Sequence, residues 1–226
     1  MGRGEAGRQA LWPRKRGAGT VEPEDWNRRY AGDELVWTAE PNRFLVAEAD
    51  GLTPGRALDL AAGEGRNAVW LAERGWEVDA VDFADAGLQK GRRLAGRRGV
   101  EVHWIRADLE RYAPERRAYD LVIIFYLHLP WARLRPVLRR ASSAVAAGGT
   151  FLLVGHDRTN LEQGHGGPKN AQVLYGADDV AGELGGLQVV EAAIRRRAVE
   201  TDSGQATALD CLVRARRGEA TGRRAI

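Results

Sequence analysis

The chain has 226 residues, of which 44% are hydrophobic, so it is long enough for one well-buried domain and too short for two of ordinary size. Its net charge of +3 comes from its ends: residues 1–20 and 214–226 are each net +4, which leaves the segment between them at −5. A single cysteine excludes an internal disulfide and a multi-cysteine metal site, and the absence of a long apolar run excludes a membrane span.

This charge distribution predicts the domain organisation. We expect a disordered basic extension over residues 1–20, a folded domain over 21–215 and a disordered basic tail over 216–226. Because the body is mildly acidic, we do not expect nucleic acid or a membrane as a partner. The first residues lack the apolar segment of a secretory signal, so we expect a cytoplasmic protein that is a monomer or a homodimer.

The predicted elements alternate along the chain after two short helices at 23–30 and 41–49. Strands are expected at 56–60, 77–81, 100–105, 119–127 and 150–154, and helices at 64–74, 84–96 and 130–145, the last capped by Gly148 and Gly149. A polar, glycine-rich loop follows over 155–175, then a helix from Asp178 and two strands at 188–194 and 207–213. The alternation predicts a parallel, doubly wound sheet, and the short connection between the last strands predicts an antiparallel hairpin. Within that hairpin, Cys211 is expected to be a buried strand residue.

Residues 57–82 are the most informative stretch. A strand ends in the turn Ala61-Ala62-Gly63-Glu64-Gly65, a helix follows, and a second strand stops at Asp82. Small residues in the turn let the backbone approach a ligand closely. A carboxylate at the end of the second strand can accept hydrogen bonds from both hydroxyls of a ribose. The stretch therefore predicts a nucleoside-binding site.

Two chemistries share this layout. The spacing Gly63-x-Gly65-x-x-Ala68 fits a dinucleotide fingerprint, so an NAD(P)- or flavin-binding oxidoreductase is one alternative. Acidic residues near the turn, Asp59 and Glu64, favour a cationic ligand over a pyrophosphate. The chain also lacks a Tyr-x-x-x-Lys pair.

The pattern Asp59-x-Ala61-x-Gly63-x-Gly65 resembles motif I of the class I S-adenosylmethionine (SAM)-dependent methyltransferases, with Ala61 in place of the first glycine. From about residue 25 to 214 the chain resembles that superfamily. Within the superfamily, Gly65-Arg66-Asn67 and the first helix most resemble the tellurite-resistance and thiopurine methyltransferases. The resemblance implies an α/β, Rossmann-like doubly wound sheet of strand order 3-2-1-4-5-7-6 with the last strand antiparallel.

The resemblance also implies SAM as the cofactor and in-line methyl transfer to a small-molecule acceptor, namely a thiol, a chalcogen oxyanion or a hydroxyl. A non-catalytic SAM-binding module is a further alternative. By the resemblance, the residues around the turn line the methionine end of SAM, Asp82 holds the ribose, and the residues after the second and third strands contact the adenine. The implied cofactor-binding residues are Tyr30, Asp59, Ala61, Gly63, Gly65, Arg66, Asn67, Asp82, Phe83, Asp108, Leu109 and Phe125.

The acceptor is expected at the ends of the strands at 119–127 and 150–154. Three histidines fall there, His128, His156 and His165, and we expect at least one to act as a general base or substrate contact. The first of these strands lacks the Asn/Asp-Pro-Pro-Tyr motif that serves amino groups in related enzymes. We expect no metal site, and we expect the loop at 155–175 to be a lid that substrate orders.

Overall fold

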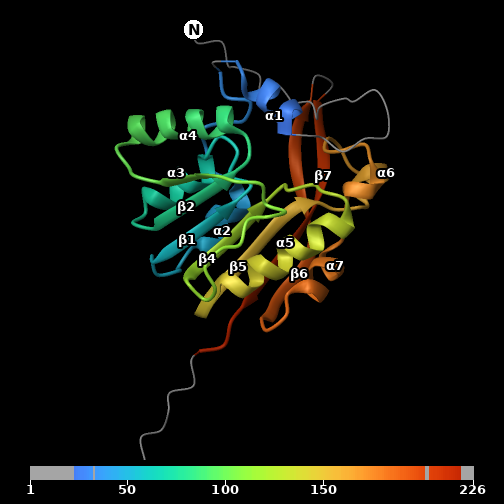
Figure 1. The fold of residues 1–226 in the computed structure, drawn as a ribbon. Helices are drawn as coiled ribbons and strands as arrows, with labels where there is room; N and C mark the ends of the chain where they lie inside the picture. Colours follow the sequence, from blue (N-terminus) through green and yellow to red (C-terminus); the bar gives the residue numbers. More distant parts are fainter. Residues whose placement is uncertain (1–22, 33, 202–203, 220–226) are drawn as a thin grey trace, which may run out of the picture.

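The computed structural model describes residues 23–32, 34–201 and 204–219, and its centre is one seven-stranded sheet (Figure 1). The strand order is β3-β2-β1-β4-β5-β7-β6. The strands are β1 (Arg56–Leu60), β2 (Glu77–Asp82), β3 (His103–Arg106), β4 (Tyr119–Phe125), β5 (Val145–His156), β6 (Gln188–Thr201) and β7 (Gly204–Arg216). Only the pairs that include β7 are antiparallel. The predicted α/β, Rossmann-like fold with its last strand antiparallel is confirmed.

Helices cover both faces of this sheet. On one face, α5 and α7 pack against the sheet together with Tyr175, and on the other face α2 and α3 do so, with α4 packing on α3 around Trp104 (Figure 1). The helices are α1 (Pro23–Tyr30), α2 (Arg43–Ala49), α3 (Arg66–Ala72), α4 (Asp85–Arg98), α5 (Trp131–Ala144), α6 (Asn160–Gln163), the 3-10 helix η1 (Ala171–Val173) and α7 (Ala177–Glu183). None of the helices in the described part of the chain is long and apolar enough to cross a membrane.

The central strand β4 shows why this sequence gives this sheet. Its residues 121–124 are all apolar and fully buried, because helices cover both of its faces. Cys211 on β7 is fully buried among apolar side chains, as its run of small and apolar neighbours predicted.

Two predictions for the chain around β5 are wrong. Residues 155–175 are not a plain loop, since they contain α6, η1 and a bridge between Asp157 and Tyr175. Helix α5 ends at Ala144 and the chain enters β5 at once, so Gly148 and Gly149 do not cap it. Gly148 instead takes a positive φ of 74° within β5.

The expected tail also starts too early. Arg216 is the last residue of β7 and pairs with Thr150. Arg217 donates hydrogen bonds to the carbonyls of Ser142, Val145 and Gly186, so its guanidinium satisfies carbonyls at the end of α5. The predicted extension over 1–20, and the tail from residue 220, lie outside the described residues.

A buried ion pair ties α4 to the turn after β1. Lys90 Nζ lies 2.9 Å from Glu64 Oε1, and the two side chains are 2% and 3% exposed. Lys90 also donates to the carbonyl of Glu34, while the N–H groups of Val36 and Trp37 each donate to Glu64 at 3.0 Å. Residues 34–37 therefore form a strap that is held over the turn by both charges.

Removing one charge of this pair should destabilise the protein strongly. We expect Lys90→Met to lower the free energy of unfolding by about 3 kcal/mol or more, because the Glu64 carboxylate would stay buried without a cation. The double variant Glu64→Gln/Lys90→Met should recover part of that loss. Urea unfolding measures both, with Lys169→Met, at an exposed lysine, as the control. Equal stability of Lys90→Met and wild type would contradict the role of the pair.

Candidate functional site

The turn at residues 61–65 lies at the carboxyl edge of the parallel strands, where α/β sheets bind ligands. Ala61, Gly63 and Gly65 all have a positive φ, at 68°, 56° and 76°. For alanine this conformation costs on the order of 1 kcal/mol relative to glycine, so the backbone shape of the motif is kept in spite of the substitution. A side chain on Gly65 would place its Cβ 2.3 Å from Trp104, so this glycine also permits the contact between α3 and α4.

Asp82 fixes the shape of this turn. Its two carboxylate oxygens accept the N–H groups of Gly63 and Ala84, each at 2.8 Å. Burial raises the pKa of Asp82, and backbone N–H donors, first Ala84 and then Gly63, oppose that rise. Each oxygen still has a further lone pair, so the carboxylate can accept hydrogen bonds from a ligand as well.

A buried carboxylate, Asp59, and a guanidinium, Arg66, lie next to the turn. Each has hydrogen-bonding capacity that the described residues leave unused. Asp59 is 1% exposed, and among the residues that the structure describes its Oδ2 atom has no hydrogen-bond partner. Burial, and then the charge of Asp82, raises the pKa of Asp59 to about 7. Arg66 is half-buried at the start of α3, and no side chain in the described parts of the chain pairs with its guanidinium. One acceptor and one cation side by side can hold a zwitterion such as an amino acid group.

Helix α1 closes this side of the site. Tyr30 is buried, and its hydroxyl would lie 3.0 Å from a Cβ on Gly63. Its ring stacks on Trp26, and its hydroxyl accepts a hydrogen bond from Trp37 Nε1 at 3.4 Å. Arg29 lies over both tryptophan rings, 5.3 Å from each centroid, so these aromatic faces are already in contact with a cation.

Two polar residues near the turn have structural partners. The predicted contribution of Glu64 to a cationic ligand site is wrong, because Lys90 neutralises it and the strap covers it. Asn67 was expected near the cofactor carboxylate, but its Oδ1 accepts the backbone N–H of Asn42, the N-cap residue of α2, at 2.9 Å. Its amide nitrogen has no hydrogen-bond partner among the described residues, so Asn67 mainly positions α2.

The residues predicted around an adenine ring follow β2 and β3, and a further predicted cofactor-binding residue, Phe125, ends β4. Phe83 is half-buried directly after Asp82, and Leu109 and Phe125 are buried in the two main apolar clusters. Asp108 is exposed, and one of its oxygens accepts the N–H of Glu110 at 2.9 Å. Its other oxygen has no hydrogen-bond partner in the ranges that the structure describes, so the turn and a ligand can share this carboxylate.

The three predicted histidines differ in what they contact. His128 Nδ1 lies 3.1 Å from the carbonyl of Val173, and its Nε2 accepts the backbone N–H of His156 at 3.3 Å. Burial lowers the pKa of His128 to about 3, so the ring stays neutral with both nitrogens engaged. His128 therefore positions the end of β5, and the prediction that it acts as a base is wrong on this geometry.

His156 lies in a polar cluster that the sequence reasoning missed. Its ring contacts Tyr126, with centroids 5.0 Å apart, and its Nδ1 lies 3.2 Å from Asp210 Oδ1 without hydrogen-bond alignment. Asp210 is fully buried, and its other oxygen accepts hydrogen bonds from Tyr126 Oη at 3.0 Å and Arg197 Nε at 2.7 Å. Burial alone would raise the pKa of Asp210, but His156 and Arg197 together lower it, so the carboxylate stays charged.

Sequence signals for this cluster were present but weak. Asp210 is an acidic residue inside the apolar run at 208–213, where a buried carboxylate requires a partner. Tyr126 has a positive φ of 55° at the end of β4, and strained backbone of this kind gathers at functional sites. Arg197 comes from β6 across the hairpin, and only the register of β6 on β7 brings it to Asp210.

The segment after β5 folds onto this cluster. A Cβ on Gly167 would lie 2.7 Å from the ring of His156, so glycine allows the backbone to lie against the imidazole. Asn160 is buried and holds the segment in place, since it accepts from Leu209 N–H and donates to the Gly166 carbonyl. The backbone N–H of His165 donates to the carbonyl of Thr207 on β7 at 2.9 Å, and this contact ties the segment to the sheet.

The raised pKa of Asp59 gives a pH-dependent contribution to stability. Because its folded-state pKa is raised from 3.8 to about 7, the neutral form is favoured, and the contribution is present below pH 3.8 and lost as pH rises through about 7. In the ligand-free protein, the free energy of unfolding of Asp59→Asn should therefore rise relative to that of wild type by up to about 1.4 kcal/mol per pH unit between pH 3.8 and about pH 7. Above about pH 7 the difference between the two proteins should stay constant. Urea unfolding at a series of pH values tests this, and pH profiles that stay parallel would contradict it.

Comparison with known proteins agrees with this geometry. A family model described as a methyltransferase domain matches residues 57–149, which include the turn, Asp82 and the strands up to the start of β5. A demethylmenaquinone methyltransferase of Thermus thermophilus is 36% identical over 125 residues, which cover 54% of this chain and 55% of that protein. A ribosomal RNA small subunit methyltransferase B of Thermus thermophilus is 44% identical over 77 residues, covering 34% of this chain and 19% of that protein.

Solved structures show the same fold. The crystal structure of TehB from Haemophilus influenzae superposes with a TM-score of 0.67 at 15% sequence identity, covering 86% of this chain and 66% of that one. The chain spans only about half, or less, of the length of the curated relatives named above. The methyltransferase-domain match over residues 57–149 and the strand order together agree with the expected resemblance to the class I SAM-dependent methyltransferases.

Proposed function

We propose that this protein binds SAM at the turn of residues 61–65 and transfers its methyl group to a small molecule held at the ends of β4 and β5. The observation that carries the proposal is the joint placement, at one sheet edge, of three groups. These are the carboxylate of Asp82, which holds the turn, and the Asp59 oxygen and Arg66 guanidinium, neither of which has a hydrogen-bond or ion-pair partner in the described part of the chain. A ribose and an amino acid group are the parts of SAM that such groups recognise.

Each group has a role in this proposal. Asp82 accepts from the ribose hydroxyls while it holds the turn, and Phe83 with Leu109 and Asp108 bounds the adenine. Asp59 accepts from the ammonium of the methionine part, and Arg66 donates to its carboxylate. Tyr30 covers the turn from α1 and, with Phe125, limits the water around the ligand. A bound ammonium also favours the ionised form of Asp59, which burial alone disfavours.

SAM supplies a sulfonium methyl group, and the acceptor must be aligned with it and, where it is a hydroxyl, deprotonated. His156 is the base in this proposal. SAM would supply the methyl group at its sulfonium carbon, and the His156 imidazole would take the proton that the acceptor loses when it is methylated. Asp210 then stabilises the imidazolium at 3.2 Å, which is the role of an orienting carboxylate beside a base. Tyr126 and Arg197 hold Asp210 in place.

A small acceptor suits this site better than a nucleic acid. The segment at 164–167 lies against His156, whose side chain is only 12% exposed, and Asn160 fixes that segment to β7. The body of the domain is net acidic, which repels a phosphate backbone. The relatives act on acceptors as different as a demethylmenaquinone and ribosomal RNA, as their names state, so the acceptor class here rests on these features of the site. The methyltransferase match over the turn leaves the oxidoreductase alternative without support.

The ribose role of Asp82 has a direct test. We expect Asp82→Ala to weaken SAM binding by about 1.5–3 kcal/mol, since a charged acceptor and the clamp on the turn are lost together. Calorimetric titration with SAM measures this. Asp85→Ala is the control, because Asp85 lies three residues on and accepts a side-chain hydrogen bond from Gln89. An unchanged dissociation constant in folded Asp82→Ala would remove the ribose assignment.

The proposed role of His156 predicts that its replacement lowers turnover and leaves SAM binding unchanged. With a hydroxyl acceptor, His156→Ala should reduce kcat by about 100-fold or more while the SAM dissociation constant stays unchanged. With a thiol acceptor the loss should be smaller, because a thiolate needs little help from a base. Formation of S-adenosylhomocysteine over a panel of small thiols and phenols measures both, with His103→Ala, at an exposed position of β3, as the control. Full activity of His156→Ala toward every accepted acceptor would leave alignment alone as the mechanism.

A further inference from the structure

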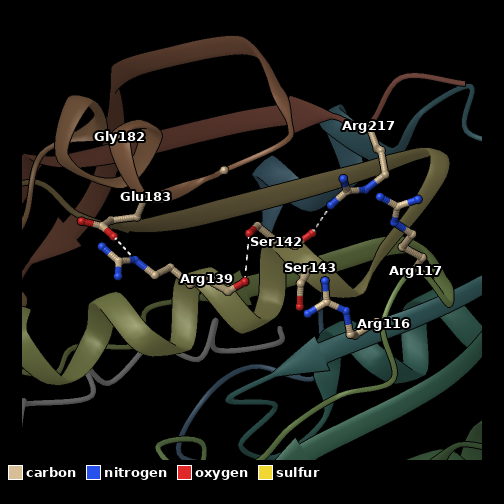
Figure 2. Close-up of a pocket in the computed structure, with 9 residues that line it drawn as sticks. Arg116, Arg117, Arg139, Ser142, Ser143, Gly182, Glu183 and Arg217 are labelled. Carbon is tan, nitrogen blue, oxygen red and sulfur yellow. Dashed lines mark hydrogen bonds and ion pairs between the residues drawn. The ribbon is translucent and has the colours of Figure 1, made fainter.

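A second polar cavity lies at the edge of the sheet opposite the proposed site. It has a volume of about 330 Å³ and is formed by the turn before β4, the carboxyl ends of α5 and α7, and the chain just after β7. Figure 2 shows three guanidinium groups, those of Arg116, Arg117 and Arg217, gathered on one side of it, with Arg139 and Glu183 on the other.

The side chains that line this cavity carry a net positive charge, from four arginines and one glutamate. Its one lining carboxylate, Glu183, already accepts from Arg139 at 2.7 Å and from Arg135, outside the cavity, at 2.6 Å. Within the described ranges, the guanidinium groups of Arg116 and Arg117 have no hydrogen-bond or ion-pair partner. Burial, and then the charges of Arg117 and Arg116, lowers the pKa of Arg217. Like charges held this close favour a bound anion between them.

The cavity is also held in shape. Arg217 is fixed by its three backbone carbonyl partners, so it offers a positioned charge rather than a mobile one. Ser142 and Ser143 donate their hydroxyl protons to carbonyls three residues earlier, so anion recognition falls to the guanidinium groups. Arg117 has a positive φ of 53°, a backbone conformation that glycine adopts without strain and other residues do not. A long cationic side chain at such a position indicates that the side chain itself has a role.

We propose that this cavity is a binding site for a small phosphate-bearing molecule, separate from the methyl-transfer site. Three guanidinium groups around one hollow match the several oxygens of a phosphate or diphosphate, which arginine binds in a bidentate manner. The walls formed by α5 and α7 bound the cavity, which favours a compact ligand over a polymer that needs an extended basic track. The site does not rest on the identity of the methyl acceptor.

The test is calorimetric titration of the full chain with inorganic phosphate and with pyrophosphate, at constant ionic strength made up with chloride. The informative variant is Arg116→Gln/Arg117→Gly. It removes two exposed charges, and glycine relieves the positive φ at residue 117, so folding should be kept. The matched control is Arg92→Gln/Arg93→Gln, which makes the same change in net charge at two exposed positions of α4 on the other face.

We expect saturable binding of phosphate or pyrophosphate that weakens by about tenfold or more in the cavity variant and is unchanged in the α4 control. SAM affinity should be the same in wild type, the cavity variant and the α4 control. Failure of the phosphate proposal can therefore be distinguished from failure of the proposed SAM site. Absence of saturable binding, or an equal loss in the α4 control, would overturn the proposal. Binding of a short RNA duplex alone, with no response to phosphate or pyrophosphate, would also overturn it and assign the arginines to a nucleic-acid surface.

Discussion

The buried ion pair between Glu64 and Lys90 is the contact on which the proposed cofactor site depends. It joins the turn after β1 to α4 and, through backbone donors and a carbonyl, to the strap at residues 34–37. A pair buried this completely is destabilising unless both partners have further hydrogen bonds, and here both do. Its effect is positional, since it keeps the turn, α4 and the strap in one arrangement beside Asp82.

The carboxyl edge of the sheet carries both parts of the proposed site, one for the cofactor and one for the methyl acceptor. The cofactor part is built from local sequence, in the turn and in the acids at the ends of β1 and β2. The acceptor part is assembled from residues far apart, because His156 ends β5, Asp210 comes from the antiparallel β7 and Arg197 from β6. Arg66 lies between the two parts, within electrostatic reach of Asp59, Tyr126 and Arg197. The antiparallel hairpin, which distinguishes this sheet from a dinucleotide fold, therefore also supplies acceptor-side residues.

This contrast explains what the sequence could predict. The bounds of β1 at 56–60 and the hairpin follow from short-range patterns of apolar residues, glycine turns and polar connections, and these predictions are confirmed. Glu64 was misjudged because its partner Lys90 lies within a run of basic residues on α4 that is typical of a solvated face. The same limit hid Asp210 and Arg197, since only the register of the hairpin brings them to His156. The partners of His128 and Asn67, a carbonyl in η1 and the N-cap residue of α2, are not visible in the sequence.

Direct titration of the unmodified protein tests the central claim. SAM, S-adenosylhomocysteine and NADH are compared by calorimetry on one preparation, because the strand–turn–helix layout alone fits both kinds of nucleoside ligand. The arrangement of Asp59, Arg66 and Asp82 predicts saturable binding of SAM and S-adenosylhomocysteine, and no measurable binding of NADH. Binding of NADH more tightly than SAM would contradict the account, since the groups assigned to an amino acid would then have no ligand to recognise.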